Sequence, residues 1–178
     1  ARGAVVTLAV RDAGRGAHAA EQVRSVAPDA HVEVEVLDLA DLASVAQFAS
    51  RWKQGHPEGL DVLVNNAGVM AIPRRETADG FEMQLGVNHL GHFLLTHLLL
   101  PSLRQTTQPR IISLSSRSHA EGRMDFEDLH KEHKPYYGYA AYSDSKLANL
   151  LFIRELARRL DGTGVVAHAV HPGVIRTG

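Results

Sequence analysis

The fold of this chain is decided by the stretch from Asp61 to Gly68, which reads DVLVNNAG. A short apolar run closed by asparagines and a glycine is typical of a strand buried on both faces of a parallel sheet. Other short β-branched runs flank it along the chain, and longer stretches that read as helices separate them. This alternation predicts an α/β domain, a doubly wound parallel sheet covered on both faces, formed by residues 1–178 as a single unit.

The predicted elements follow from hydrophobic periodicity. The predicted strands are Ala4 to Val10, His31 to Leu37, Asp61 to Val64, Arg110 to Leu114 and Val165 to Val170. The predicted helices are Gly14 to Ala27, Leu42 to Lys53, Gly80 to Gln105 and Ala141 to Leu160. The segment from Ser118 to Gly138 has no clear period and is predicted to be a long loop beside the functional site.

Composition excludes several classes of function. With 178 residues, 44% hydrophobic content and a formal net charge of −1, the chain suits neither nucleic acid nor an anionic membrane as its main partner. Its most apolar run, Phe93 to Leu103, is too short to span a membrane. The absence of cysteine fits a cytoplasmic protein. Two histidine pairs, His89 with His92 and His130 with His133, have a spacing that metals can use on a helix, but no convincing constellation of carboxylates joins either pair, so we predict no metal site.

Small or polar residues follow all five predicted strands. In open α/β sheets, ligands bind at the carboxyl ends of the strands, so these residues are predicted to gather at one edge. They are Arg11-Asp12, Asp38-Leu39, Asn65 to Gly68, Ser115-Ser116 and His171 to Thr177.

Tyr142 and Lys146 lie four residues apart in the run AYSDSKLA, so a helix places them on one face, about one turn apart. A phenol is a poor acid or base near neutral pH, because its reference pKa is about 10. A neighbouring ammonium favours the phenolate and lowers that pKa toward the range useful for proton transfer to a carbonyl or from an alcohol. None of the three tyrosines just upstream has a lysine four residues on. Taken alone, the spacing is also compatible with an ordinary helix start.

These motifs together resemble the short-chain dehydrogenase/reductase superfamily. Asn-Asn-Ala-Gly after a strand, an asparagine in the next helix, a serine before a loop, Tyr-x-x-x-Lys and Pro-Gly occur in the family's order over essentially the whole chain. Thr77 to Glu82, Gly86 to Phe93 and His171 to Val174 look like the retinol-dehydrogenase-like branch. The resemblance implies a Rossmann-like sheet and an oxidoreductase that acts on lipophilic alcohols or carbonyl compounds.

The resemblance also assigns catalytic roles. Tyr142 is expected to be the general acid or base, and Lys146 is expected to lower the Tyr142 pKa and to bind the nicotinamide ribose. Ser116 is expected to hold the substrate oxygen, with the adjacent Ser115 as the alternative. Asn88 is expected to shape a water-mediated proton relay, and a polar residue in an otherwise apolar helix is costly unless it is partnered.

The cofactor prediction rests on Arg11. In this family an acid near the end of the second strand binds the free 2′-hydroxyl of the adenosine ribose, whereas a base accommodates a 2′-phosphate. A guanidinium binds phosphate with two parallel hydrogen bonds, so NADP(H) is favoured, with NAD(H) as the alternative because Asp12 follows. The other cofactor-binding residues implied by the resemblance are Asp38, Leu39, Asn65, Ala67, Gly68, Tyr142, Lys146, Pro172, Gly173 and Thr177.

One part of the family pattern is missing from residues 1–178. The glycine-rich turn and the first strand that open the family's fold are absent, so the strands beginning at Ala4 and Asp61 are expected to face a gap. We therefore expect the sequence to be a piece of a longer protein. The matching helices in this family pair across a dimer axis, which implies a homodimer or homotetramer. The alternatives to an active oxidoreductase are an inactive fragment and a dinucleotide-sensing or scaffold protein with the same fold.

Overall fold

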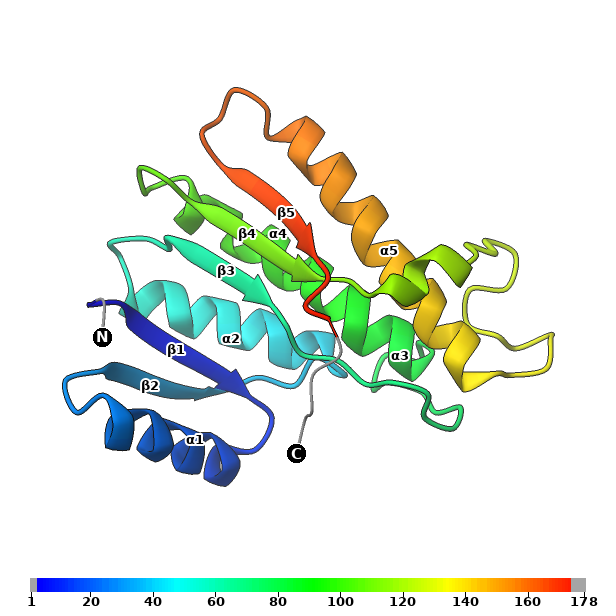
Figure 1. Ribbon diagram of the computed structural model, residues 1–178, viewed down its shortest axis with the longest axis horizontal. Helices are drawn as coiled ribbons and strands as arrows, with labels where there is room; N and C mark the ends of the chain where they lie inside the picture. The colour runs from blue at the N-terminus through cyan, green and yellow to red at the C-terminus, as the bar shows by residue number, and fades with distance from the viewer. Residues whose placement is uncertain (1–2, 174–178) are drawn as a thin grey trace.

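The computed structural model describes residues 3–173 and shows the predicted alternation of strands and helices (Figure 1). The elements are, in chain order, β1 (Val5–Val10), α1 (Ala13–Val26), β2 (His31–Val36), α2 (Leu42–Gly55), β3 (Val62–Asn65), α3 (Met83–Leu85), the π-helical turn η1 (Gly86–Leu90), α4 (Gly91–Leu103), β4 (Arg110–Leu114), the 3₁₀ turn η2 (Arg117–Glu121), α5 (Gly138–Arg159) and β5 (Val166–Val170). The strand predictions are therefore confirmed to within one residue at each end.

All the strand pairs are parallel, but they form two separate sheets. β1 pairs with β2, and β3, β4 and β5 form a second sheet in that order. Within residues 3–173, β1 and β3 do not pair with each other, as predicted for strands that face a gap. Side chains of both strands are also exposed to solvent: Val5 of β1 and Val64 of β3 are each more than half exposed.

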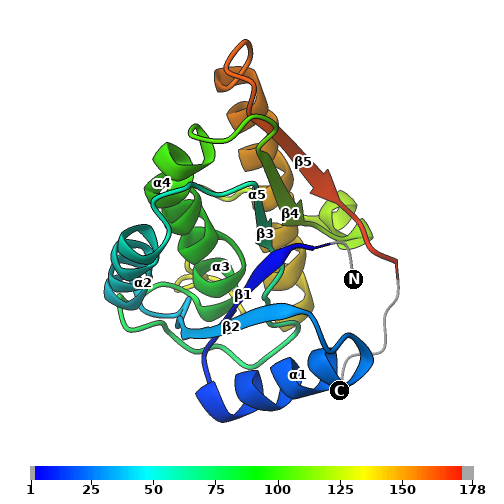
Figure 2. The same ribbon diagram turned by 90° about the vertical axis from the view of Figure 1, so that its left-hand side faces the viewer.

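The helices lie on opposite faces of the β1–β2 sheet. Side chains alternate along a strand, so Thr7 and Val10 point to opposite faces. Thr7 accepts a hydrogen bond from the Trp52 indole of α2, whereas Val10 packs where α1 comes closest, at Gly16. Figure 2 shows the same arrangement, with α1 on one side of β1 and β2 and α2 on the other. The β1–β2 sheet is therefore covered by one helix on each face, as in a doubly wound domain.

Within residues 3–173, helices cover one face of the second sheet (Figure 1). Helices α4 and α5 bury one face, through side chains such as Leu63, Ile111 and Ala167. The alternating side chains on the other face stay largely exposed, and Val62 and Val166 are both over 40% exposed. No helix in the described part of the chain lies over that face.

A single apolar core joins the two sheets through the helices between them. It contains Leu37 and Leu39 after β2, Val45, Phe48 and Trp52 of α2, Leu95, Leu99 and Leu103 of α4, and Ile153 and Leu160 of α5. Aspartates define where two of the helices begin, because Asp12 and Asp41 accept backbone hydrogen bonds as N-caps. No helix within residues 3–173 has both the length and the apolar character needed to cross a membrane.

The helix predicted from Gly80 to Gln105 is divided into three parts. Glu82 caps α3 by accepting hydrogen bonds from the backbone N–H groups of Gln84 and Leu85. One widened turn, η1, then separates α3 from α4. Such turns insert one extra residue into a helix and occur frequently at functional sites.

Gly91 sets how closely α4 approaches the loop after β2. A Cβ atom at this position would lie 2.6 Å from the backbone oxygen of Leu39, closer than two such atoms can come. We predict that Gly91→Ala lowers the free energy of unfolding by about 2 kcal/mol through overpacking, as measured by urea denaturation.

Gly55→Ala is the matched control, because a Cβ there would meet no atom within 4 Å. Alanine is the better helix former, so Gly55→Ala should leave stability unchanged or raise it by up to about 1 kcal/mol. Equal effects of the two substitutions would contradict the close approach at Gly91.

Candidate active site

The four predicted catalytic residues come from three different elements that meet beyond the carboxyl ends of β3 and β4. Asn88 lies in η1, Ser116 follows β4, and Tyr142 and Lys146 lie on the first half of α5. Gly68, in the loop after β3, joins them, since a Cβ atom there would lie 3.0 Å from Asn88 Oδ1 and 3.7 Å from Lys146 Nζ. The sheet thus brings together residues that are far apart in sequence.

Asn88 is fully buried and all of its polar groups are partnered. Its Oδ1 accepts from the Val69 N–H at 2.8 Å, and its Nδ2 donates to the Val69 oxygen at 2.9 Å. The same Nδ2 donates to Ser145 Oγ at 2.9 Å, and Ser145 in turn donates to the Tyr142 carbonyl. The amide therefore fastens the loop after β3 to the helix that carries Tyr142.

Lys146 is buried beside Tyr142. Only 5% of its surface is exposed, and Nζ donates to the Leu114 carbonyl at 3.0 Å while lying 5.5 Å from the centroid of the Tyr142 ring. Burial disfavours the ammonium form and lowers the pKa of Lys146. The Tyr142 side chain is half-buried, and within residues 3–173 its hydroxyl makes no hydrogen bond. A positive charge thus lies next to a phenol that is available to a ligand.

The two serines after β4 have different environments. Ser115 is buried and donates its hydroxyl to the Lys146 carbonyl at 2.8 Å, so it fixes α5 to the sheet. Ser116 is half-buried, and its Oγ accepts from the Ser118 N–H as the N-cap of η2. Ser116 is thus the serine with the more accessible hydroxyl, and its assignment as the catalytic serine stays a prediction.

The adenosine end of the predicted cofactor site lies at the end of β1. Arg11 is exposed immediately after the strand. Asp12, the residue that argued for NAD(H), uses one carboxylate oxygen to cap α1 by accepting from the Arg15 N–H at 2.9 Å. Asp38 is half-buried, and its carboxylate accepts from the Ala40 N–H. Between Arg11 and Asp12, Arg11 is therefore the residue whose side chain is more available to a ligand.

Two predicted cofactor residues point into the protein. The Leu39 side chain belongs to the apolar core, and the Asn65 amide donates to Thr96 Oγ1 in the interior, so only their backbones could face a ligand. Ala67 and Gly68 after β3, and Pro172 and Gly173 after β5, are exposed at the edge where ligands are expected. Thr177 lies outside the described residues.

Sequence reasoning missed a group of buried polar residues behind the site. His92 is 4% exposed and its Nδ1 donates to the Asn88 carbonyl, while His89 donates to Asn149. Asn149 donates to the Leu114 carbonyl, which also accepts from Lys146. Both histidines interrupt an apolar helix next to Asn88, which was the available signal for buried polar partners.

Burial keeps these two histidines neutral. It lowers the pKa of His89, and it lowers the pKa of His92 to about 4, an effect to which the Lys146 charge also contributes. No group of three or more His, Asp or Glu side chains in the described part of the chain could hold a metal ion. The two histidines therefore act as hydrogen-bond donors to the site.

Asp144 fixes the long loop beside Tyr142. One of its carboxylate oxygens accepts from the Arg123 N–H at 2.7 Å, and the other forms an ion pair with Lys131 at 2.7 Å. Both partners belong to the segment predicted as a loop, which apart from η2 contains no helix or strand. One side chain of α5 therefore holds the loop at two points.

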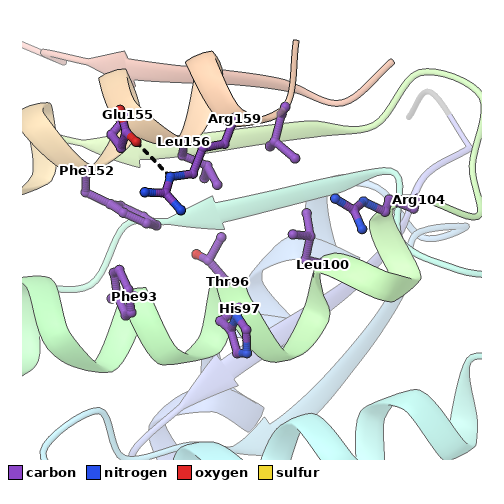
Figure 3. Close-up of a pocket in the computed structure, with 10 residues that line it drawn as sticks. Phe93, Thr96, His97, Leu100, Arg104, Phe152, Glu155, Leu156 and Arg159 are labelled. Carbon is purple, nitrogen blue, oxygen red and sulfur yellow. Dashed lines mark hydrogen bonds and ion pairs between the residues drawn. The ribbon is translucent and has the colours of Figure 1, made fainter. Parts of the chain in front are cut away.

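A cavity of about 410 Å³ lies elsewhere, between α4 and the second half of α5 (Figure 3). Phe93 and Phe152 line one end of it, and Arg104 lies at the other. Its residues on α5 begin at Phe152, well over one turn beyond Lys146. This cavity is therefore separate from the candidate active site.

Comparisons with known proteins identify the family of this chain. A family model described as short chain dehydrogenase matches residues 1–178. Human retinol dehydrogenase 13 is 50% identical over 176 residues, which are 99% of this chain and 53% of the relative. An uncharacterised protein from Mycobacterium paratuberculosis, solved by crystallography, is 48% identical with a TM-score of 0.84, over 99% of this chain and 61% of that one. A metagenomic short-chain oxidoreductase in complex with NADP is 26% identical with a TM-score of 0.73, over 97% and 72%. The chain spans about half the length of the curated relatives it matches.

Neutral, buried His92 should make stability depend on pH. Its folded-state pKa of about 4 lies below the ordinary value of 6.5, so the unfolded chain binds a proton that the folded protein does not. Stability is therefore complete above pH 6.5 and is lost as the pH falls toward 4. Between pH 7 and pH 5 this group should cost roughly 2 kcal/mol, as measured by urea denaturation at each pH.

His92→Asn keeps an N–H donor for Asn88 but does not titrate, so its stability should fall by roughly 2 kcal/mol less over that range. The exposed His97 of the same helix is the matched control, and His97→Asn should keep the wild-type pH dependence. An unchanged pH dependence in His92→Asn would refute the buried neutral state.

Proposed function

Because this chain belongs to the short chain dehydrogenase family, we propose that it is an oxidoreductase that transfers a hydride between NADP(H) and a lipophilic alcohol or carbonyl compound. The observation that carries this proposal is the burial of Lys146 beside Tyr142. The ammonium lies 5.5 Å from the phenol ring, and Asn88 and Ser115 fix the helix that carries both residues.

Each residue has a role in the proposed reaction. In the direction of reduction, the hydride adds to the carbonyl carbon and Tyr142 donates its hydroxyl proton to the carbonyl oxygen, which gives the alcohol and a phenolate. The Lys146 charge stabilises this phenolate. Ser116 donates a hydrogen bond to the same oxygen and orients it. In the direction of oxidation, the Tyr142 phenolate accepts the hydroxyl proton.

The described residues fit both ends of the proposed cofactor. Gly68 lacks a side chain where one would touch Asn88 and crowd Lys146, so the loop after β3 lies directly against both residues at this edge. Lys146 would bind the nicotinamide ribose, and Arg11 would bind the 2′-phosphate of the adenosine ribose. NADP(H) supplies or accepts the hydride when it is bound.

The choice of NADP(H) over NAD(H) rests on Arg11. Its guanidinium is exposed at the end of β1, whereas Asp12 has one oxygen committed to the N-terminus of α1. A relative of 26% identity has been solved in complex with NADP. The name of the human relative suggests a retinoid substrate, so retinaldehyde is the substrate to test first.

The proposed assembly is a homodimer or homotetramer through the outer faces of α4 and α5. Phe93 and Leu151 are each more than 40% exposed on these helices, and half of the side chains that line the cavity between them are apolar. A second copy would cover this surface. A cytoplasmic location is part of the same proposal and rests on the absence of cysteine.

Tyr142→Phe tests the proposed acid. The substitution removes one hydroxyl, so the kcat for reduction of retinaldehyde by NADPH should fall at least about a hundredfold. The Kd for NADPH should stay within about twofold, because the lysine and the backbone contacts remain. Both are measured on the protein expressed from its complete reading frame.

Two outcomes separate the alternatives. Turnover at the wild-type rate in Tyr142→Phe means that Tyr142 is not the acid. NADPH binding without turnover in the wild type supports a dinucleotide-sensing or scaffold protein instead.

Arg11→Ala tests the cofactor. Loss of two charge-assisted hydrogen bonds should raise the KM for NADPH by about ten- to a hundredfold. The KM for NADH should not change, because NADH has no 2′-phosphate, and it serves as the internal control. Equal effects on the two cofactors would rule out a phosphate contact at Arg11.

A further inference from the structure

Gln84 joins the loop after β3 to the first residue of α5. Its side chain is fully buried in α3. Its Oε1 accepts from the Ala71 N–H at 2.8 Å, and its Nε2 donates to the Gly138 carbonyl at 2.8 Å and to the Tyr136 hydroxyl at 2.7 Å. One amide therefore links α3 to two segments of the chain, one on each side of it in sequence.

The partners fix the orientation of this amide. A backbone N–H can only donate and a carbonyl oxygen can only accept, so Oε1 must face Ala71 and Nε2 must face Gly138. The Tyr136 hydroxyl accepts from Nε2 and donates to Glu82 Oε1 at 2.9 Å, which agrees with the same orientation. Rotation of the amide by half a turn would place oxygen against oxygen and N–H against N–H.

The loop after β3 also touches the start of α5 directly. A Cβ atom at Gly138 would lie 2.9 Å from the Ile72 carbonyl oxygen and 3.0 Å from the Ala71 carbonyl carbon. Ala71 has a left-handed backbone, with a φ of 52°, which is uncommon for residues other than glycine. Such a conformation persists where neighbouring contacts hold it, and Gln84 supplies one of these contacts at the Ala71 N–H.

The Gly138 carbonyl lies one helical turn before Tyr142. In an α-helix each N–H donates to the carbonyl four residues earlier, so the regular partner of the Gly138 carbonyl is the Tyr142 N–H. Gln84 therefore holds a group that positions the Tyr142 backbone. On the other side of Tyr142, Asn88 holds Ser145. Two buried amides thus fix α5 before and after the proposed acid.

We propose that Gln84 is a positioning residue: by holding the start of α5 against the loop after β3, it sets the distance between the Tyr142 hydroxyl and the substrate oxygen. Proton transfer needs these two oxygens within roughly 3 Å of each other, so a small displacement of the helix start lowers its rate. Gln84 is fully buried, so it acts through the backbone of α5 rather than by contact with a ligand. This inference rests on the proposed function, because it takes Tyr142 to be the acid.

The first test is Gln84→Met, which keeps the length of the side chain but cannot donate a hydrogen bond, in the protein expressed from its complete reading frame. With retinaldehyde and NADPH, kcat should fall roughly tenfold, while the Kd for NADPH stays within about twofold. In the Tyr142→Phe background the same substitution should change the residual rate by less than about twofold, because the group that it positions is gone. A general loss of structure would lower both rates by the same factor.

Gly138→Ala tests the same contact without removing a hydrogen bond. The added Cβ would push α5 away from the loop after β3, so kcat should fall by about three- to tenfold, and again only where Tyr142 is present. This variant decides the question if Gln84→Met does not fold.

The matched controls lie on α2. Gln47→Met changes an exposed glutamine, and Gly55→Ala adds a Cβ that meets no atom within 4 Å, so both should keep the wild-type kcat. Urea denaturation of every variant establishes that it is folded under the conditions of the assay.

The outcomes separate this inference from the proposed function. A wild-type kcat in either folded variant, or an equal factor of loss in the Tyr142→Phe background, overturns the role of Gln84 alone. Absence of turnover in the wild-type protein overturns the proposed function and this inference with it.

Discussion

The candidate site depends on the side-chain amide of Asn88. This amide pairs with both backbone groups of Val69 as another strand would, and it also reaches Ser145 on α5. Three segments far apart in sequence are therefore held together by one buried group. An unpartnered amide at this depth would be costly, so the contacts are mutually required. The position of Tyr142 relative to the sheet follows from them.

The electrostatic character of the site follows from what surrounds Lys146. Its ammonium is out of water, and the two buried histidines behind it are neutral. The nearest fixed partner of the charge is the dipole of the Leu114 carbonyl. A charge that is held by a dipole keeps its effect on a neighbouring phenol, because no carboxylate within residues 3–173 forms an ion pair with it. The buried polar residues around it are needed to keep this arrangement in one geometry.

The sequence predicted the elements well because the apolar runs and the caps are local signals. β4 begins and ends at the predicted residues, and α5 begins three residues early. The orientation of Leu39 and Asn65 could not be predicted, because it depends on which helix comes to lie over them. The role of His89 behind Asn88 could not be predicted, because its partner Asn149 lies on α5, 60 residues away.

The widened turn of η1 has a consequence for how this segment can vary. Each residue of an α-helix turns the chain by about 100°, so the extra residue in η1 sets the angular register between α3 and α4. Deleting any one residue from Gly86–Leu90 would close the turn and rotate α3 by that angle relative to α4. Glu82 and Gln84, whose hydrogen bonds hold Tyr136 and the start of α5, would then face the wrong way. The length of this segment is therefore fixed by the contacts at its two ends.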